Sequence, residues 1–178
     1  MDFKEVIRKR RSVRKFSEQR VEREVIRRVL DEVVNYAPSS RNSHSSRFLV
    51  VADPETLERI SEMRDYGASF VKGAPMAILV MGDKTKPDLW EVSCAISTTM
   101  LLQALVDAGL KGCWVHVKDR PVKKDEPEGK KAIEHLREFL PIPEHYGVLC
   151  AVACGYSDFE PAALPEWDKS EVVSFFER

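Results

Sequence analysis

The chain has 178 residues and a net charge of −1; 43% of its residues are hydrophobic and 32% are charged. This length and composition predict one globular domain, residues 1–178, that buries a core without disulfides or metal. The charge is uneven, because residues 1–50 carry +6 and the remainder carries −7. Nucleic-acid-binding proteins usually have a broader basic excess, so we expect a local anion site and no nucleic-acid partner.

The N-terminus has no apolar stretch of the kind that secretory signals contain. Residues 89–110 form the longest apolar-rich run, but Glu91 and Asp107 interrupt it, which predicts a core helix and no membrane span. No CxxC motif and no zinc-like histidine spacing is present, so we expect no metal site. We expect four buried free thiols in a reducing cytoplasm: Cys94, Cys113, Cys150 and Cys154.

The first half of the chain alternates between helical and strand patterns. Asp2 can cap a short first helix, and a double apolar stripe predicts a second helix over 21–35. Residues 48–52 are continuously apolar, which predicts a strand covered on both faces. Asp53-Pro54-Glu55 is a typical helix start and predicts a helix to about residue 64.

In the second half, strands are predicted over 77–81, 113–117 and 147–155. A long helix over 89–108, capped by Asp88 and ended by Gly109, carries apolar residues all round. We therefore expect this helix at the centre of the domain or in a subunit interface. A charged loop over 118–128 precedes a short helix over 132–140, and the aromatic tail after residue 157 should pack on something, such as a second subunit. The alternation predicts an α+β or α/β domain.

An arginine-rich segment, residues 10–16, ends the first helix. Arg10, Arg11 and Arg14 offer planar hydrogen-bond donors for an oxyanion, and Ser12 adds a hydroxyl. We interpret these residues as an arm that binds phosphate. Taken alone, the segment is equally compatible with a solvated basic face.

Four motifs occur in order: Arg10-Arg11-Ser12-Val13-Arg14-Lys15-Phe16, Ala37-Pro38-Ser39-Ser40-Arg41-Asn42-Ser43, residues 100–114 with their Gly109-Leu110 turn, and residues 147–156. The ordered set resembles the nitroreductase family of flavoenzymes, which bind flavin mononucleotide (FMN). The resemblance implies an α+β fold with a central, mostly antiparallel sheet, flanking helices and a long interface helix. It also implies a homodimer with flavin at the subunit interface.

By the same resemblance, the residues of the arm would bind the flavin phosphate. Arg14 and the amide of Asn42 could also contact the pyrimidine edge of the flavin ring and stabilise the reduced flavin. Pro38, Ser39, Ser40 and Asn42 would reach the flavin, often across the dimer. The main chain of Trp114-Val115-His116 would face flavin N5, and Tyr66 and Trp90 would fall at the substrate face. No side chain need act as acid or base. Hydride would pass from NADH or NADPH, through the flavin, to a small acceptor such as a nitroaromatic or quinone, with ping-pong kinetics.

The sequence also departs from the family pattern. His44-Ser45-Ser46-Arg47 replaces the common Gln-Pro-Trp, and Lys169 stands where many members carry a basic pair. Three alternatives therefore stay open. They are a specialised relative, such as a dehalogenase or flavin-fragmenting enzyme; a flavin carrier or sensor without turnover; and a nucleic-acid binder, whose binding would depend strongly on salt.

Overall fold

The computed structural model describes residues 1–86, 89–168, 170 and 172–176. The expected cap Asp88 and the basic residue Lys169 lie outside this set. The elements, in chain order, are α1 (Phe3–Lys9), α2 (Arg23–Tyr36), η1 (Ser40–Asn42), β1 (Ser46–Val51), α3 (Pro54–Ser61), η2 (Ser69–Gly73), β2 (Met76–Asp83), α4 (Trp90–Asp107), β3 (Lys111–His116), α5 (Ala132–Arg137) and β4 (Tyr146–Gly155).

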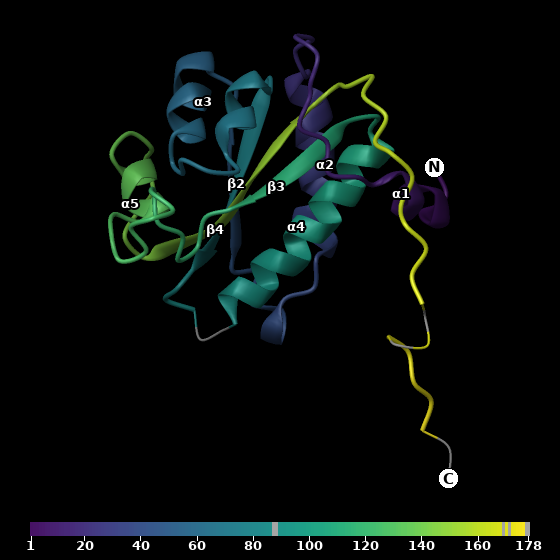
Figure 1. Cartoon of the computed structure of the whole chain (residues 1–178). Coiled ribbons are helices and arrows are strands. Elements are labelled where there is room, and N and C mark those ends of the chain that lie inside the picture. The colour runs from purple at the N-terminus through teal and green to yellow at the C-terminus, as the bar shows by residue number, and fades with distance from the viewer. Residues whose placement is uncertain (87–88, 169, 171, 177–178) are drawn as a thin grey trace.

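One antiparallel sheet organises the chain, with strand order β1-β2-β4-β3. Helices cover both of its faces, which confirms the α+β expectation (Figure 1). Every residue of β2 is buried, and nine of the ten residues of β4 are buried, as expected for central strands covered on both sides. β3 forms one edge of the sheet, and the arm reaches that edge.

The core has two layers because strand side chains alternate between the faces of the sheet. On one face, Leu79 and Ala151 belong to a cluster completed by Leu57 and Ile60 of α3 and Leu136 of α5. On the other face, α2 and α4 pack together over the sheet (Figure 1). Residues of this second cluster include Ile26, Val29, Val33, Ile78, Val80, Leu101, Leu105 and Val152.

The expectation for residues 48–52 was wrong in one respect. The strand forms, but β1 lies at the edge of the sheet, and Val50 is 38% exposed. An apolar run does not distinguish an edge strand from a central one, because both bury at least one face. The helices predicted to residues 64 and 140 end at Ser61 and Arg137, three residues early in each case.

α4 packs its first turn against a pair of glycines. Gly82 of β2 and Gly147 of β4 are cross-strand neighbours, and the indole of Trp90 lies over both. A Cβ atom added at Gly82 would come within 2.4 Å of Trp90 Cε3, and one at Gly147 within 2.5 Å of its Cη2. The two glycines therefore make room for the indole, and they fix where α4 begins.

Much apolar surface remains uncovered. After Gly155 the chain first runs beside the arm, where the Ser157 hydroxyl donates to the Lys15 carbonyl, and it then extends away from the body (Figure 1). Trp167, Phe175 and Phe176 in this segment are between 74% and 90% exposed. Val92 on α4 and Phe3 on α1 are also exposed. Among the described residues, none of the helices has the length and apolar character that crossing a membrane requires.

Candidate functional site at the edge of β3

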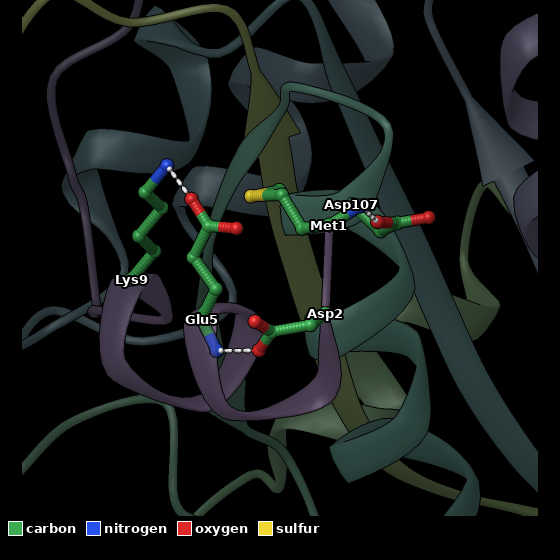
Figure 2. A network of polar contacts seen from close by, with 5 residues as sticks. All are labelled: Met1, Asp2, Glu5, Lys9 and Asp107. Carbon is green, nitrogen blue, oxygen red and sulfur yellow. Dashed lines mark hydrogen bonds and ion pairs between the residues drawn. The ribbon is translucent and has the colours of Figure 1, made fainter.

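The first helix holds the arm in place from its N-terminal end. The side chain of Asp2 caps α1 by accepting the N–H of Glu5 at 2.9 Å. The terminal ammonium of Met1 donates to Asp107, the last residue of α4, at 2.8 Å (Figure 2). Glu5 also pairs with Lys9 one turn later, at 2.7 Å. α1 is thus tied to the C-terminal end of α4 just before the arm begins.

The arm then runs in an extended conformation beside the sheet. Ser12 forms a parallel bridge with Gly112 at the start of β3, and the N–H of Val13 donates to the Gly112 carbonyl at 3.2 Å. Ser17 N–H donates to the carbonyl of Tyr156, directly after β4. The side chain of Val13 is fully buried and so anchors the arm.

Because the arm is extended, alternate side chains point to opposite sides. Arg10, Ser12 and Arg14 gather near Cys113. Burial raises the pKa of the Cys113 thiol, while the charge of Arg14, a hydrogen bond with Ser12 and the charge of Arg10 act against that rise. Arg11 lies elsewhere, in a hollow lined also by Arg8, Lys9, Lys111, Glu160 and Pro161. The structure therefore brings three of the four predicted phosphate ligands together and separates Arg11 from them.

The three grouped residues remain available to a ligand. Within the described part of the chain, neither Arg10 nor Arg14 forms an ion pair with a carboxylate. Arg14 is exposed, and its guanidinium carbon lies 5.6 Å from the centre of the Phe70 ring. A cation resting on an aromatic face keeps its N–H donors free at the edges. The cluster therefore offers uncompensated positive charge and oriented donors.

β3 presents main-chain groups along the same edge. The Gly112 carbonyl points to the arm, the His116 carbonyl accepts Arg64 Nη1 at 2.8 Å, and Val117 N–H donates back toward β4. In an antiparallel strand the N–H and C=O of one residue point to the same side, and the side alternates. The N–H groups of Trp114 and His116 therefore face outward. Val115 has its N–H directed to β4 and its side chain buried in the core.

His116 lies in positively charged surroundings. Burial lowers its pKa most, and Arg120, Arg64 and Lys118 lower it further, while Asp119 acts in the opposite direction. Its ring stacks with that of Trp114, with centroids 6.1 Å apart and planes at 14°. The neutral imidazole is thus favoured at the end of β3.

The predicted Ser/Asn loop has an unusual backbone. Arg41, Asn42 and His44 all have positive φ, between 46° and 54°, which is uncommon outside glycine. Ser39 supports the loop, because its hydroxyl accepts His44 N–H and its carbonyl accepts Asn42 N–H, both at 3.0 Å. Pro38 and Asn42 are exposed, whereas Ser39 and Ser40 are half-buried. Left-handed residues held in this way often occur at functional sites.

This loop lies far from the arm within one chain. It leads into Ser46 of β1, which aligns across the sheet with Gly82 and Gly147, whereas Gly112 of β3 aligns with Cys154. Three strand spacings and seven residue rises separate the two corners, roughly 27 Å along the diagonal of the sheet. The predicted site residues therefore fall into two groups: one at β3 (Arg10, Ser12, Arg14, Trp114, His116) and one at the β1 corner (Pro38, Ser39, Ser40, Asn42).

Tyr66 and Trp90, expected at a substrate face, lie in different places. Tyr66 lies beneath the guanidinium of Arg64, 4.1 Å from ring centre to Cζ, close to the end of β3. Trp90 packs on Gly82 and Gly147. Arg64, Phe70, Cys113 and Arg120 were not predicted as site residues. Cys113 directly precedes Trp114, whereas Arg64, Phe70 and Arg120 lie outside the four motifs, so that only the fold brings them to this edge.

The expected burial of the four cysteines as free thiols is confirmed. Burial raises the pKa of Cys150 and of Cys154 to about 12, so neither supplies a thiolate near neutral pH. Among the described residues, no group of three or more His, Cys, Asp or Glu side chains could hold a metal ion.

The arrangement at β3 is suited to binding an anion and a polar planar molecule.

Comparison with known proteins agrees with this geometry. A sequence model described as the Nitroreductase family matches residues 7–64 and 56–156. A protein of Methanothermobacter thermautotrophicus with the provisional name NADH dehydrogenase/NAD(P)H nitroreductase is 33% identical over 97% of this chain and 86% of its own length. Mouse iodotyrosine deiodinase 1 is 29% identical over 93% of this chain and 65% of its own length.

A solved structure extends the likeness to three dimensions. The FMN-dependent nitroreductase from Clostridium difficile R20291 is 34% identical, with a TM-score of 0.86 over 96% of each chain. At 23% identity, a nitroreductase from Desulfovibrio desulfuricans, solved in complex with FMN, shows the same fold with a TM-score of 0.76 over 95% of this chain and 93% of its own.

Proposed function

Since the chain belongs to the nitroreductase family, we propose that it is an FMN-dependent oxidoreductase that takes electrons from NADH or NADPH. The observation that carries the proposal is the free cationic group of Arg10, Ser12 and Arg14 beside an open strand edge. Bound FMN would supply the chemistry, accepting hydride from the nicotinamide and passing it to a small acceptor, such as a nitroaromatic or quinone, in a ping-pong cycle. The protein's own residues would bind the cofactor and orient the cofactor and its substrates.

The residues at β3 fit such a cofactor. A phosphate monoester carries nearly two negative charges and several acceptor oxygens, and Arg10, Arg14 and Ser12 supply matching charge and donors. Arg11, on the far side of the arm, would act on the phosphate through longer-range charge. Val13 keeps the donors in register by anchoring the arm in the core.

The main chain would serve the flavin ring. The outward N–H groups of Trp114 and His116 flank Val115 in the stretch that we assign to the N5 edge. Fixed strand amides need no reorganisation when charge develops on a bound ring, which makes them good electrostatic stabilisers. No side chain acts as acid or base in this proposal, and a neutral His116 is consistent with that.

A second copy of the chain would complete the site. Pro38, Ser39, Ser40 and Asn42 lie too far from the arm to contact the same flavin within one chain. We propose that this loop comes from the partner of a homodimer. α4 is apolar all round and half-exposed at Met100 and Leu102, and the aromatic tail is uncovered, so both have surface to bury in such a dimer.

The family also contains relatives with other reactions, as the name iodotyrosine deiodinase shows for the mouse protein. A dehalogenating or flavin-fragmenting reaction would use the same flavin site with a different acceptor. A carrier without turnover would share the flavin but not react with nicotinamide. Free thiols are typical of reducing compartments, so we propose that the protein is cytoplasmic.

The visible absorption spectrum tests the proposal. Purified protein, saturated with FMN, should show flavin bands that bleach anaerobically when NADH or NADPH is added. Bands that persist would instead support a carrier or an enzyme with another donor. A protein that fails to take up FMN would contradict the proposal altogether.

A further inference from the structure

The end of β3 is shaped by an irregularity in β4. The register between β2 and β4 shifts after Val80, which leaves Leu149 as an extra residue in β4. The carbonyl of Leu149 accepts the N–H of Val117 at 2.9 Å and that of Lys118 at 3.2 Å. A bulge of this kind ends regular pairing and redirects the chain. β3 therefore stops just beyond His116.

The turn that follows fixes the position of Arg120. Asp119 has φ of 57°, and Arg120 N–H donates to the Val117 carbonyl at 3.1 Å. The carbonyl of Arg120 in turn accepts Ala132 N–H, at the start of α5, at 2.8 Å. The main chain of Arg120 is held at both ends, while its side chain is exposed.

Arg64 approaches the same point from beyond the end of α3. Its Nη1 donates to the His116 carbonyl at 2.8 Å, and its guanidinium lies over the ring of Tyr66. Its Nε is buried and has no hydrogen-bond partner. Buried donors are usually satisfied, so Arg64 keeps one donor that has no partner within the described chain.

The positive charge at this point is not compensated. Lys118 pairs with Glu91 and with Asp119, whereas the Asp65 carboxylate accepts the N–H of Lys124. In the described part of the chain neither Arg64 nor Arg120 has an ion-pair partner. The positive charges of Arg64 and Arg120 both act on His116, about 13 Å along β3 from the Gly112 end where the arm lies.

We propose that Arg64 and Arg120 form an oxyanion subsite for the electron acceptor, so that the preferred acceptor is an aromatic compound with a carboxylate. The inference rests on the proposed function, since it takes the edge of β3 as the flavin edge. Tyr66, under Arg64, offers an aromatic wall beside the subsite. Guanidinium groups bind carboxylates through paired hydrogen bonds, which gives both affinity and orientation.

The two arginines have separable roles in the test. Arg64 also ties α3 to β3, so that its replacement would disturb the fold as well as the subsite. Arg120 makes no side-chain bond to the rest of the described chain and is the better probe. Arg28 is a matched control, because it is exposed on α2, across the sheet from α3 and α5.

The experiment compares 4-nitrobenzoate with 4-nitrobenzamide, which share a ring and a nitro group but differ in charge. FMN-saturated wild type, Arg120→Gln, Arg120→Lys and Arg28→Gln are assayed for binding by calorimetry and for kcat/KM with NADH and with NADPH. Wild type should prefer the carboxylate about tenfold, as expected for a charge-assisted hydrogen bond. Arg120→Gln should lose most of that preference, Arg120→Lys should keep much of it, and Arg28→Gln should match wild type.

Each outcome separates the inference from the function on which it rests. Equal binding of the two compounds, or equal loss in Arg28→Gln, overturns the subsite even if both compounds turn over. Arg120→Gln could instead lower kcat/KM with NADPH more than with NADH and leave the preference between the two nitro compounds unchanged. That result overturns the subsite for the acceptor and indicates that Arg120 binds the extra phosphate of NADPH. Preferential binding without turnover supports the subsite and counts against the proposed oxidoreductase.

Discussion

Arg14 is the residue of the arm that should matter most to flavin binding. It is exposed, unpaired within the described chain and grouped with Arg10 and Ser12, so Arg14→Ala should weaken FMN binding about 10- to 100-fold. Loss of its contact with Phe70 should cost at most about 1 kcal/mol of unfolding free energy. Fluorescence titration with FMN and urea unfolding measure the two effects.

Arg11→Ala is the matched control within the same arm. Because Arg11 lies in the hollow with Arg8 and Lys111, its loss should weaken FMN binding clearly less than the loss of Arg14. Equal losses would mean that the arm acts as diffuse charge and that the alternation of its side chains is irrelevant.

His116 should make the stability of the fold depend on pH. Burial, followed by Arg120, Arg64 and Lys118, lowers its folded-state pKa, so the unfolded chain takes up a proton more readily. This contribution to stability is present above the unfolded pKa of about 6.5 and is lost as pH falls through the folded pKa. As the pH falls from about 6.5 through the folded pKa of His116, the unfolding free energy of wild type should therefore decrease more than that of His116→Gln.

Two measurements check the histidine prediction. Urea unfolding from pH 7.5 downward compares wild type with His116→Gln, which keeps a polar side chain at the end of β3. NMR titration of the imidazole gives the folded pKa directly. A folded pKa at or above that of free histidine would contradict the prediction.

At the scale of elements, the junction between α4 and the sheet depends on a pair of glycines. Gly147→Ala would put a methyl group 2.5 Å from Trp90, so that the indole or the start of α4 must shift. Overpacking of this kind costs about 1–3 kcal/mol. Adding Trp90→Leu should recover part of that cost, which a double-mutant cycle of unfolding free energies measures. Strict additivity would mean that the two side chains do not meet.

The elements with the strongest patterns were those that the sequence predicted best. The apolar runs of β2 and β4 were recognised because both faces of each strand are buried, and α4 was recognised because apolar residues surround it, although part of its surface is exposed in the single chain. β1 was placed in the interior incorrectly, since its apolar run says nothing about which strands lie beside it. The bulge at Leu149 was not predicted, because it arises from pairing between distant segments.

The candidate site was predictable to a similar extent. Arg10, Ser12 and Arg14 could be proposed because they are close in sequence and all three can donate hydrogen bonds to an oxyanion. The separation of Arg11 depends on the extended path of the arm, which Val13 and the carbonyl of Gly112 determine. Arg64 and Arg120 are far apart in sequence, and only the fold brings the segment after α3 and the turn after β3 to the same end of β3.

At the scale of the whole molecule, a single chain leaves its two groups of site residues apart and its tail uncovered. A symmetric dimer could resolve both, because a two-fold axis would bring the β1 corner of one chain to the β3 edge of the other, twice. If the flavin site is shared in this way, each site contains Arg14 from one chain and Asn42 from its partner. Variants at these two positions should then complement each other.

Complementation tests this shared site directly. The Arg14→Ala and Asn42→Ala chains, carrying different tags, are coexpressed, and the hybrid dimer is purified through both tags. One site of the hybrid combines the intact Arg14 and the intact Asn42, while the other carries both substitutions. The hybrid should therefore bind half of the FMN that the wild-type dimer binds, at wild-type affinity, whereas each variant homodimer binds weakly at both sites. If Arg14 and Asn42 instead served the same flavin within one chain, every site of the hybrid would carry one substitution, and no wild-type affinity would return.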